Sequence, residues 1–585
     1  MSLGATKVTD NTHEMSLADL TSQTLRLLIP LFQREYVWTK KQLDRLTREL
    51  DSIVEGEDTN RFLGAIIAVR RLTNPAEPQL YEIVDGQQRL ATLYLFVIAS
   101  VEVAASKGHI DYATSLYNAH AIMPFASATS VPINTKLVPS YSDRAQFNAI
   151  FKMLFTTKAF TKEDEGRLRL PESTGDPNGK LIKQYARIKA YLIGRYREAE
   201  TNDAGFGRLQ SIVQAAMSCL TFVFIVLKDP ASATTVFEGL NDSGMPIGTG
   251  DLVRNELFAR VGDDWASAKT LHTLHWLPFQ ERLGKNFDDF FFPYCVIQDS
   301  AARKADMFGS LRNQWGKEVN PSNIIALLDQ YSIPFLAIST LDLHSEFSTS
   351  IQLQLRRLVE IRRPAAVYPF VMQLLRGNLD RKVTSEDASS CLATLESFLV
   401  RRAICGIEPT GLLGLFRTMW TNLQGAPTST TVAAVILKRL TVEWPDDERL
   451  RDSILTRRFY KSAISEYAIR EYDSSLGADV PDGSPPWIEH VLPQTPTSEW
   501  KIHFDDKNQL ELCHTWGNLV PLTSKMNMEV SNQSYKEKRE VFMNDSMYGS
   551  ARRLAENFDE WTPDAVKQRG KEIGDWAVTR WPRPN

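Results

Sequence analysis

The sequence predicts an α+β protein of several domains. Its 585 residues exceed what a single hydrophobic core usually organises, so we expect two to four domains. Apolar runs of strand type occur at residues 62–71 and 220–227, whereas helical periodicity dominates from about 260 to 420. Short strands and motif-like polar residues return near the C-terminus. The expected domains are an α/β module at 1–260, a mainly helical middle domain at 261–425 and a strand-strand-helix domain at 432–585.

Composition and charge narrow the classes of function. Apolar residues make up 43% of the chain and charged residues 24%, close to the average of folded globular domains. The formal net charge of −4 argues against a uniformly basic nucleic-acid coat, although a local positive groove is compatible with it. Five cysteines without a Cys-x-x-Cys pair indicate a reducing compartment, with neither a zinc knuckle nor a disulfide framework.

No membrane segment is expected from the sequence. Residues 1–20 are polar and carry acids, unlike a signal peptide. The longest apolar stretch, residues 90–105, is interrupted by Glu102 and is too short to span a bilayer. We therefore expect a soluble protein of the cytoplasm.

The N-terminal third alternates helix and strand. Thr39 can cap a helix in which apolar residues recur on one face, namely Leu43, Leu46, Leu50 and Ile53. Residues 62–71 predict a buried strand. Residues 81–100, YEIVDGQQRLATLYLFVIAS, switch from strand to turn to helix within a few positions, so we expect a functional strand-to-helix corner there.

That corner places five polar or small residues where the strand ends and the helix begins: Asp85, Gly86, Gln87, Gln88 and Arg89. Free backbone N–H groups and the helix dipole make such a corner suited to phosphate. Gly86 lets a ligand approach the backbone, and Arg89 can fork onto phosphate oxygens. Asp85 could hold a metal ion or a water. An ordinary loop with a capping Asp is the alternative interpretation of the same pentapeptide.

The sharpest pattern lies in two C-terminal segments, WIEHVLPQ at 487–494 and WGNLVPLTSKMNMEVSNQSYKEK at 516–538. The first is a short apolar strand that carries Glu489 and His490. The second begins at a Gly-Asn turn, passes through an apolar strand and enters a helix near Met526. The two segments predict a strand, a return strand and a helix that bring His, Asn and Asn together.

Phosphodiester hydrolysis explains these residue types. It needs a base to activate water, and neutral imidazole titrates close to working pH. It also needs a hard divalent cation such as Mg²⁺ or Mn²⁺, which carboxylate and amide oxygens can bind. We assign roles to four residues: His490 as general base, Glu489 and Asn527 as metal ligands, and Asn518 as the residue that holds the loop of the base strand through backbone hydrogen bonds.

Other polar residues nearby receive no catalytic role. His503 and His514 are not accompanied by a comparable set of polar motif residues and are expected in loops or at the surface. The basic residues of the following helix are equally compatible with DNA phosphate binding and with a solvated face: Lys536, Lys538 and Arg539.

The two C-terminal segments resemble the nuclease domain of the GmrSD-type modification-dependent (type IV) restriction enzymes, a member of the His-Asn-His or ββα-metal superfamily. The EH-x-LPQ box, the GNL box, the Asn nine residues later and the SN-x-x-aromatic-x-x-K helix all match. The third catalytic position is Asn527 rather than His. This departure argues against a zinc-type ligand set.

Four further segments resemble boxes of the N-terminal domain of the same family: IPLFQREYVW (29–38), FLGAII (62–67), DGQQRLATL (85–93) and FEGLNDSGMPIGTGDLVRN (237–255). That domain is similar to the ParB/sulfiredoxin-like fold, in which a Gly-x-x-Arg corner binds nucleotide. The resemblance implies binding and hydrolysis of a nucleoside triphosphate, whether GTP, ATP or another. It places the nucleotide at Asp85, Gly86, Gln87, Gln88 and Arg89, with Gln33 and Arg34 beside the pocket.

The combined prediction is a nucleotide-dependent restriction endonuclease that nicks or cuts modified, invading phage DNA. Its partners would be double-stranded DNA and a nucleotide but no membrane, and the role in defence follows from the resemblance alone. Two alternatives stand beside it: an RNA-cleaving abortive-infection toxin, and a nucleotide-switched DNA-binding protein with an inactive nuclease site. The sequence leaves open a homodimer, the modification, the preferred nucleotide, and whether hydrolysis activates or restrains cleavage.

Overall fold

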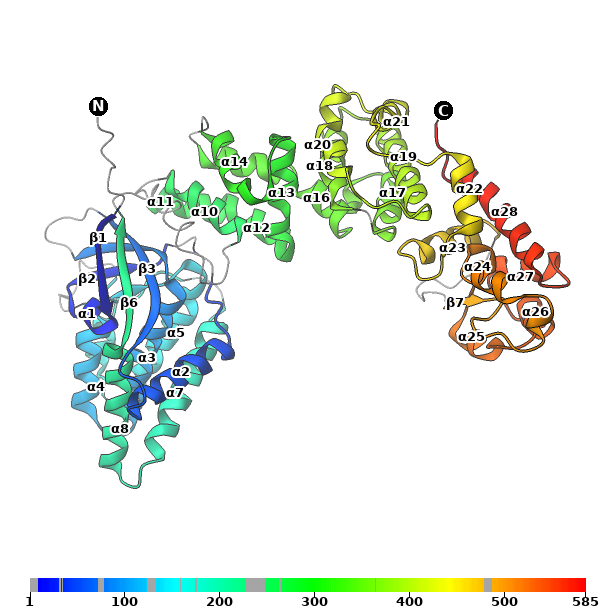
Figure 1. Ribbon diagram of the computed structural model, residues 1–585. Coiled ribbons are helices and arrows are strands. Elements are labelled where there is room, and N and C mark those ends of the chain that lie inside the picture. Colours follow the sequence, from blue (N-terminus) through cyan, green and yellow to red (C-terminus); the bar gives the residue numbers. More distant parts are fainter. Residues whose placement is uncertain are drawn as a thin grey trace, which may run out of the picture. The chain divides into compact units, whose positions relative to one another are not determined.

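The computed structural model describes residues 9–30, 33, 35–71, 78–123, 133–157, 159–173, 176–227, 248–261, 265–316, 318, 320–362, 364–477 and 487–584. The chain divides into two compact units, which are described separately (Figure 1). Unit 1 comprises residues 1–278 and 318–322, and unit 2 comprises residues 279–317 and 323–585. The predicted α+β, multidomain class is confirmed by a mixed sheet in the N-terminal region and a mainly helical remainder. The three predicted domain boundaries stay a prediction.

Unit 1 is built on a six-stranded mixed sheet with the strand order β1-β6-β3-β4-β2-β5. Its strands are β1 (Thr9–Ser16), β2 (Leu25–Leu28), β3 (Arg61–Arg71), β4 (Gln79–Asp85), β5 (Leu137–Val138) and β6 (Leu220–Leu227). Strand β3 pairs in parallel with β6 and antiparallel with β4. The two apolar runs that predicted strands are therefore neighbours in the middle of one sheet (Figure 1).

The described helices of unit 1 are α1 (Leu17–Ser22), α2 (Lys40–Val54), α3 (Gln87–Ser106), α4 (Ile110–Leu116), α5 (Arg144–Leu154), α6 (Lys162–Arg167), α7 (Lys180–Arg197), α8 (Asn202–Gln214), α10 (Thr249–Ala259) and α11 (Trp265–Leu271). The predicted cap of α2 is present, because Thr39 and Gln42 form a capping box. The face of α2 that holds Leu43, Leu46 and Leu50 is buried, as the helical spacing predicts.

The two faces of the sheet follow from the two-residue period of β3. Ile66 and Ala68 belong to the large core that the sheet shares with the helices. Ile67 and Val69 point to the opposite face, where they form a smaller cluster that Leu252 of α10 covers. Both faces of the central strands are therefore apolar, which explains their continuous apolar sequences.

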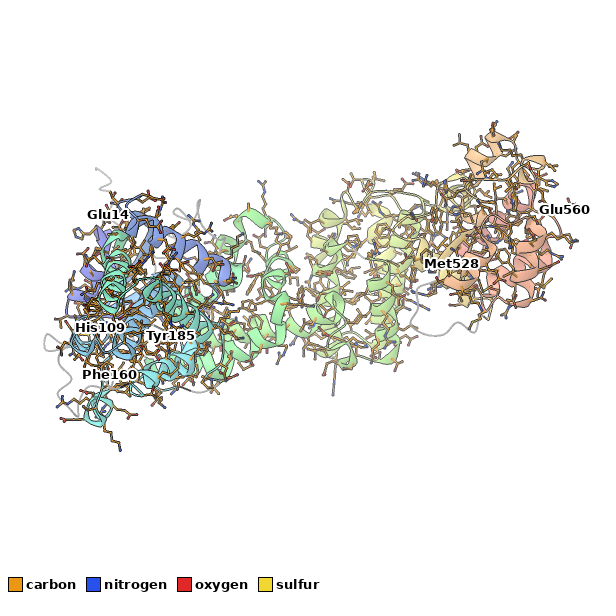
Figure 2. The ribbon with its side chains drawn as sticks, turned by 90° about the horizontal axis from the view of Figure 1, so that it is seen from below. Glu14, His109, Phe160, Tyr185, Met528 and Glu560 are labelled. Carbon is orange, nitrogen blue, oxygen red and sulfur yellow. The ribbon has the colours of Figure 1, made fainter. Side chains whose placement is uncertain are left out.

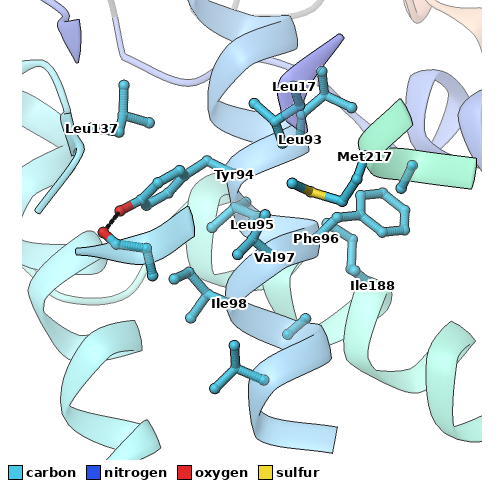
Figure 3. Close-up of a cluster of buried hydrophobic side chains, with 14 of the residues drawn as sticks. Leu17, Leu93, Tyr94, Leu95, Phe96, Val97, Ile98, Leu137, Ile188 and Met217 are labelled. Carbon is cyan, nitrogen blue, oxygen red and sulfur yellow. Dashed lines mark hydrogen bonds between the residues drawn. The ribbon is translucent and has the colours of Figure 1, made fainter. Parts of the chain in front are cut away.

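Helix α3 fills the large core of unit 1. In Figure 3, Leu93 and Phe96 of α3 lie among Leu17 of α1, Ile188 of α7 and Met217. Within the described residues α3 is the one helix long and apolar enough to cross a membrane, but nearly all of its side chains are buried inside the unit. Its apolarity is therefore that of a core helix.

Gly86, between β4 and α3, has a left-handed backbone with φ 89°. A Cβ at this position would lie 2.8 Å from Cγ1 of Ile66 and 3.2 Å from the carbonyl oxygen of Ala65. We expect Gly86→Ala to destabilise unit 1 by about 1–3 kcal/mol more than the same change at an open glycine of like backbone, the range for overpacking, measured by urea unfolding. Gly108→Ala is the matched control, because Gly108 has φ 88° but nothing within 4 Å of its would-be Cβ. Equal losses in the two variants would contradict the close packing of Gly86 on β3.

Unit 2 is mainly helical. The helices from α12 to α23 are α12 (Leu277–Leu283), α13 (Phe287–Gln298), α14 (Met307–Trp315), α15 (Pro321–Asp329), α16 (Ser332–Ser339), α17 (Thr349–Glu360), α18 (Tyr368–Leu379), α19 (Ser385–Ile404), α20 (Leu412–Asn422), α21 (Ser429–Lys438), α22 (Asp447–Thr456) and α23 (Ser465–Ser474). The C-terminal elements are β7 (Trp487–His490), α24 (Asp506–Leu512), β8 (Leu519–Leu522), α25 (Ser524–Val530), α26 (Tyr535–Asn544), α27 (Gly549–Asn557) and α28 (Pro563–Arg580).

A buried carboxylate ties distant helices of unit 2 together. Glu396 of α19 accepts hydrogen bonds from the hydroxyl of Tyr467 (2.7 Å), from Nε1 of Trp581 (3.0 Å) and from the guanidinium of Arg580 (2.7 Å). These contacts join α19 to α23 and to the end of α28, so the C-terminal elements pack in part on the core of the helices before them and in part on a core of their own.

Candidate functional site

The two polar C-terminal motifs meet in a small antiparallel sheet followed by a helix. Strand β7 ends at His490 and pairs with β8. Helix α25 starts directly after β8, where the hydroxyl of Thr523 accepts a hydrogen bond from the backbone N–H of Met526 (3.2 Å). Because α25 packs against β7, the helix of Asn527 lies against the strand of His490. The predicted strand, return strand and helix are thus present.

Asn518 is fully buried at the start of β8 and uses both ends of its amide. Its Oδ1 accepts from the backbone N–H of Leu492 (2.7 Å) and from Nε1 of Trp561 (3.0 Å). Its Nδ2 donates to the carbonyls of Leu492 (3.0 Å) and Cys513 (2.8 Å). The side chain therefore fixes the loop after β7 to the segment before β8. Its contribution to catalysis stays a prediction.

His490 lies in a buried polar network, with 4% of its surface exposed. Its Nε2 is 3.1 Å from Nδ1 of His514, and its Nδ1 is 3.5 Å from Nε2 of Gln494. The ring of Tyr460 meets the His490 ring edge-on, with 4.2 Å between the centroids. If the Gln494 amide donates to Nδ1, the Nε2–H of His490 donates to His514, because a neutral imidazole carries one N–H. In that tautomer Nδ1 holds the lone pair.

The surroundings of His490 favour its neutral form. Burial lowers the pKa of His490 to about 3, and positive charge on His514 and Lys538 adds to the shift. The exposed side chains of Arg458 and Lys461 act in the same direction. Burial and Arg458 also hold the pKa of His514 below its usual value. The imidazole of His490 is therefore uncharged near neutral pH, with a lone pair on one ring nitrogen.

His514 is the residue that the sequence analysis missed. It lies in a loop as expected, but its ring contacts that of His490, which the sequence did not indicate. The backbone N–H groups of Phe459 and Tyr460 donate to the carbonyl of His514, at 2.8 and 3.2 Å, and the Tyr460 ring stacks on the His514 ring. No local pattern indicates this contact, because it depends on how the 459–460 segment and the two strands fold together.

Glu489 points to a different neighbour from His490. Nζ of Lys538, a fully buried side chain of α26, donates to Oε1 of Glu489 (2.5 Å) and to the carbonyl of His490 (2.8 Å). Burial raises the pKa of Glu489 and lowers the pKa of Lys538, while each partner's charge opposes the shift of the other. The pair therefore sets the orientation of the carboxylate beside β7.

The basic residues of α26 divide by their contacts. The hypothesis that Lys538 binds DNA phosphate is wrong, because its ammonium group is buried against Glu489. Arg539 pairs with Asp559 at 2.8 Å. Lys536 is exposed, as a solvated helix face predicts.

Glu489 and Asn527, the predicted metal ligands, have donor atoms of the type that a hard divalent ion binds. They offer one carboxylate and one amide, and Mg²⁺ or Mn²⁺ typically takes a few protein oxygens and completes its shell with water and phosphate. Asn527 is half-buried, and its side-chain amide has no hydrogen-bond partner among the described residues. The next residue, Met528, is 72% exposed (Figure 2), so this turn of α25 borders solvent.

Gln33 and Gln87 connect the N-terminal corner to neighbouring segments through side-chain hydrogen bonds. Nε2 of the buried Gln33 donates to the carbonyl of Val84 (3.4 Å) and to Oδ1 of Asn255 in α10 (3.3 Å). Nε2 of Gln87 donates to Oε1 of Gln33 (3.4 Å). The glutamines thereby join the segment before α2 to the start of α3 and to α10. Arg34 lies outside the described residues.

Gln88 and Arg89 are also engaged by the backbone of neighbouring segments. Oε1 of Gln88 accepts from the N–H of Val37 (2.8 Å), and its Nε2 donates to the carbonyl of Glu35 (3.3 Å). A guanidinium nitrogen of Arg89 donates to the carbonyl of Ala65 (2.5 Å).

Gly86 and Asp85 complete the corner. The expectation that Gly86 leaves room for a ligand needs correction, because β3 occupies the space of its missing side chain. Gly86 has no side chain with which to cap α3, and among the described residues no side chain accepts from the first N–H groups of this 20-residue helix. Asp85 is half-buried at the end of β4.

Two protein-family models match the chain. The model described as "GmrSD restriction endonuclease, N-terminal domain" matches residues 17–258. The model described as "GmrSD restriction endonucleases, C-terminal domain" matches residues 444–576. The first match contains the corner at the start of α3, and the second contains the β7–β8 sheet with α25. No curated protein matches the chain.

Proposed function

The chain belongs to the GmrSD restriction endonuclease family, whose activity implies a DNA substrate, and from this premise we propose that it cleaves modified phage DNA at a Mg²⁺-dependent centre around His490. The observation that carries the proposal is the buried, neutral His490 on β7. Asn518 fixes the loop that follows this strand, and the helix that carries Asn527 packs against the strand. Metal-assisted phosphodiester hydrolysis requires a general base held in a fixed position and oxygen ligands for the metal ion.

In the proposed mechanism, Nδ1 of His490 accepts a proton from the attacking water. The water oxygen bonds to phosphorus, and the bond from phosphorus to the leaving oxygen breaks. A negative phosphate beside the ring opposes the lowering of the His490 pKa, since an opposite charge favours the protonated form. Mg²⁺, held through Glu489 and Asn527, would supply charge stabilisation on the phosphate and the leaving oxygen. Asn518 keeps the His490 strand in place throughout.

Arg458 and Lys461 are the basic side chains that we propose for contact with DNA phosphates. Both are exposed beside the His490–His514 pair, and neither has an ion-pair partner in the described part of the chain. An unpaired cation next to a phosphodiester site lowers the free energy of the bound nucleic acid by releasing counterions.

We expect the double variant Arg458→Ala/Lys461→Ala to bind DNA more weakly and with a smaller dependence on salt. The slope of log K against log salt should fall by about 2, since each phosphate contact contributes roughly 0.9. The measurement is fluorescence anisotropy with a DNA duplex at several salt concentrations. Lys438→Ala/Arg439→Ala, which removes the same charges from exposed positions at the end of α21, should keep the wild-type slope. Equal slopes in the two double variants would count against the assignment.

For the N-terminal domain we propose binding and hydrolysis of a nucleoside triphosphate at the start of α3. The uncapped N-terminus of this long helix supports a phosphate site there, and the match to the N-terminal family model covers it. Gln33, Gln87 and Gln88 would then hold the walls of the site.

If nucleotide hydrolysis and DNA cleavage occupy different sites, a nuclease-inactive variant should keep its nucleoside triphosphatase activity. We expect His490→Ala to release phosphate from GTP or ATP at the wild-type rate, since His490 belongs to unit 2 and the corner to unit 1. Phosphate release is measured with both nucleotides in the absence of DNA. Loss of hydrolysis together with cleavage would place both activities at one site.

The proposed function is tested by a panel of modified and unmodified phage DNAs, incubated with the full chain, Mg²⁺ and each nucleoside triphosphate or none. We expect cleavage of at least one modified DNA and dependence of its rate on one nucleotide. Equal cleavage of modified and unmodified DNA would contradict the sensing of a modification, and cleavage that ignores every nucleotide would contradict the role of unit 1.

A further inference from the structure

Three potential metal ligands converge next to the proposed base. The ligand atoms of His490, Cys513 and His514 all lie within 4.8 Å of one another, and His490 and Cys513 are buried. The Sγ of Cys513 makes only long contacts, 3.8 Å to the carbonyl of Leu492 and 3.9 Å to that of Pro493. The thiol is therefore held loosely, beside two imidazoles that face each other.

The distance between the facing nitrogens of the two imidazoles is close to the distance between two nitrogens that bind one metal ion. Nε2 of His490 and Nδ1 of His514 are 3.1 Å apart. Two nitrogens bound to a tetrahedral Zn²⁺ at about 2.0–2.1 Å lie roughly 3.3–3.4 Å apart. A shift of a few tenths of an ångström would therefore bring the two nitrogens to the spacing of a shared ion. The Sγ of Cys513, within 4.8 Å of both, would close in by up to about 1 Å, while its backbone stays fixed by Asn518.

We propose that His490, His514 and Cys513 form a binding site for a transition-metal ion of the Zn²⁺ class, and that an ion bound there inhibits the nuclease. Imidazole and thiolate are ligands for Zn²⁺, Co²⁺ or Ni²⁺ and not for Mg²⁺. Three protein ligands leave a fourth position for water. The inhibitory part rests on the proposed function of His490, whereas the binding part does not.

The proton balance of binding is simple. Burial raises the pKa of the Cys513 thiol to about 11, so the ion displaces one proton, which leaves to solvent as the metal–sulfur bond forms. The proton on Nε2 of His490 moves to Nδ1, and the ring stays neutral. His514 binds through Nδ1 and keeps its proton on Nε2.

This rearrangement removes the base. A neutral imidazole offers a lone pair at one nitrogen only, so an ion on Nε2 leaves Nδ1 of His490 carrying a proton. The ring can then no longer accept a proton from water. Gln494 lies 3.5 Å from Nδ1 and can turn its carbonyl oxygen towards the new N–H, as partners of metal-bound histidines commonly do.

The site differs from the proposed Mg²⁺ site. Adjacent residues of a strand face opposite sides, and Glu489 faces Lys538 whereas His490 faces His514. The repulsion between a bound ion and the nearby positive charges is reduced, because Lys538 is paired with Glu489 and the exposed Arg458 and Lys461 are screened by solvent. The thiolate adds a negative charge that offsets part of the ion's own.

Binding is tested by titrating the full chain with Co²⁺ and following the thiolate-to-cobalt charge-transfer absorption in the near ultraviolet. We expect a single saturating site in the wild type and none in Cys513→Ser. Cys405→Ser is the matched control, because Cys405 is buried and its Sγ also contacts a carbonyl, that of Arg449, at 3.8 Å. No charge-transfer band in the wild type, or an unchanged band in Cys513→Ser, overturns the site.

Inhibition is tested by adding buffered Zn²⁺ to the Mg²⁺-dependent cleavage assay. We expect the wild-type rate to fall by about 100-fold, which is within the range that a general base contributes. Half-inhibition of Cys513→Ser should need at least about tenfold more Zn²⁺ than the wild type, because loss of a group around a metal ion costs at least about that factor in affinity. Cys405→Ser should respond like the wild type. Cleavage that resists Zn²⁺ while Co²⁺ binds overturns the inhibitory part, whereas absence of any cleavage contradicts the proposed function and leaves the Co²⁺ test intact.

Discussion

Replacing His490 with alanine is expected to lower the rate of DNA cleavage by about 10²–10⁴-fold, the range that a positioned general base contributes. The ring is neutral, buried and oriented by His514 and Gln494, and alanine cannot accept the proton of the attacking water. The measurement is the single-turnover rate at which a modified phage DNA is nicked or cut in Mg²⁺ with the nucleoside triphosphates present.

DNA affinity is expected to stay at the wild-type level in His490→Ala, since the imidazole is buried and the exposed cations beside it are unchanged. His503→Ala is the control for loss of a histidine in the same unit, because His503 is exposed, and it should cleave at the wild-type rate. Undiminished Mg²⁺-dependent cleavage by His490→Ala would remove His490 from the mechanism.

Lys538→Met should destabilise unit 2 by about 3–5 kcal/mol, the cost of leaving a buried ion-pair partner without its counter-charge. Lys538 is fully buried, and its ammonium group donates both to Glu489 and to the carbonyl of His490. Methionine fills the space of the lysine stem but satisfies neither oxygen. The loss is measured by urea unfolding, followed by tryptophan fluorescence.

Two variants sharpen the Lys538 experiment. Lys536→Met changes an exposed lysine of the same helix and should leave stability within about 0.5 kcal/mol of the wild type, as surface substitutions usually do. Glu489→Gln/Lys538→Met removes both charges and should recover part of the loss. If Lys538→Met unfolds at the same urea concentration as Lys536→Met, the buried pair does not stabilise the C-terminal elements.

Elements with strong local patterns could be predicted from the sequence. The apolar run at 220–227 is β6 to the residue, and Thr39 begins α2 as predicted. The strand-turn-helix around Gly86 is also present. In each case the spacing of apolar side chains reports which residues are buried, and burial follows the period of the local backbone.

Partners across the fold could not be predicted in the same way. Local periodicity carries no information on which distant side chain a buried group meets, so the contacts of His490 with His514 and of Glu489 with Lys538 appear only in the folded chain. The same holds for Gly86, because β3 occupies the space that its side chain would need. The loop contacts of Asn518 are an exception, because the Gly-Asn turn before the return strand predicts a side chain that holds the loop of the His490 strand, and these hydrogen bonds are present.

We propose that the C-terminal site hydrolyses DNA with the help of a divalent ion, and the most direct measurement incubates the purified full chain with a modified phage DNA and with RNA of the same sequence. Each is given the nucleoside triphosphates, in Mg²⁺ and in excess chelator. We expect the DNA to be nicked or cut in Mg²⁺, cleavage to stop in chelator, and the RNA to stay intact. Cleavage of RNA alone, or DNA cleavage that persists in chelator, would contradict the account.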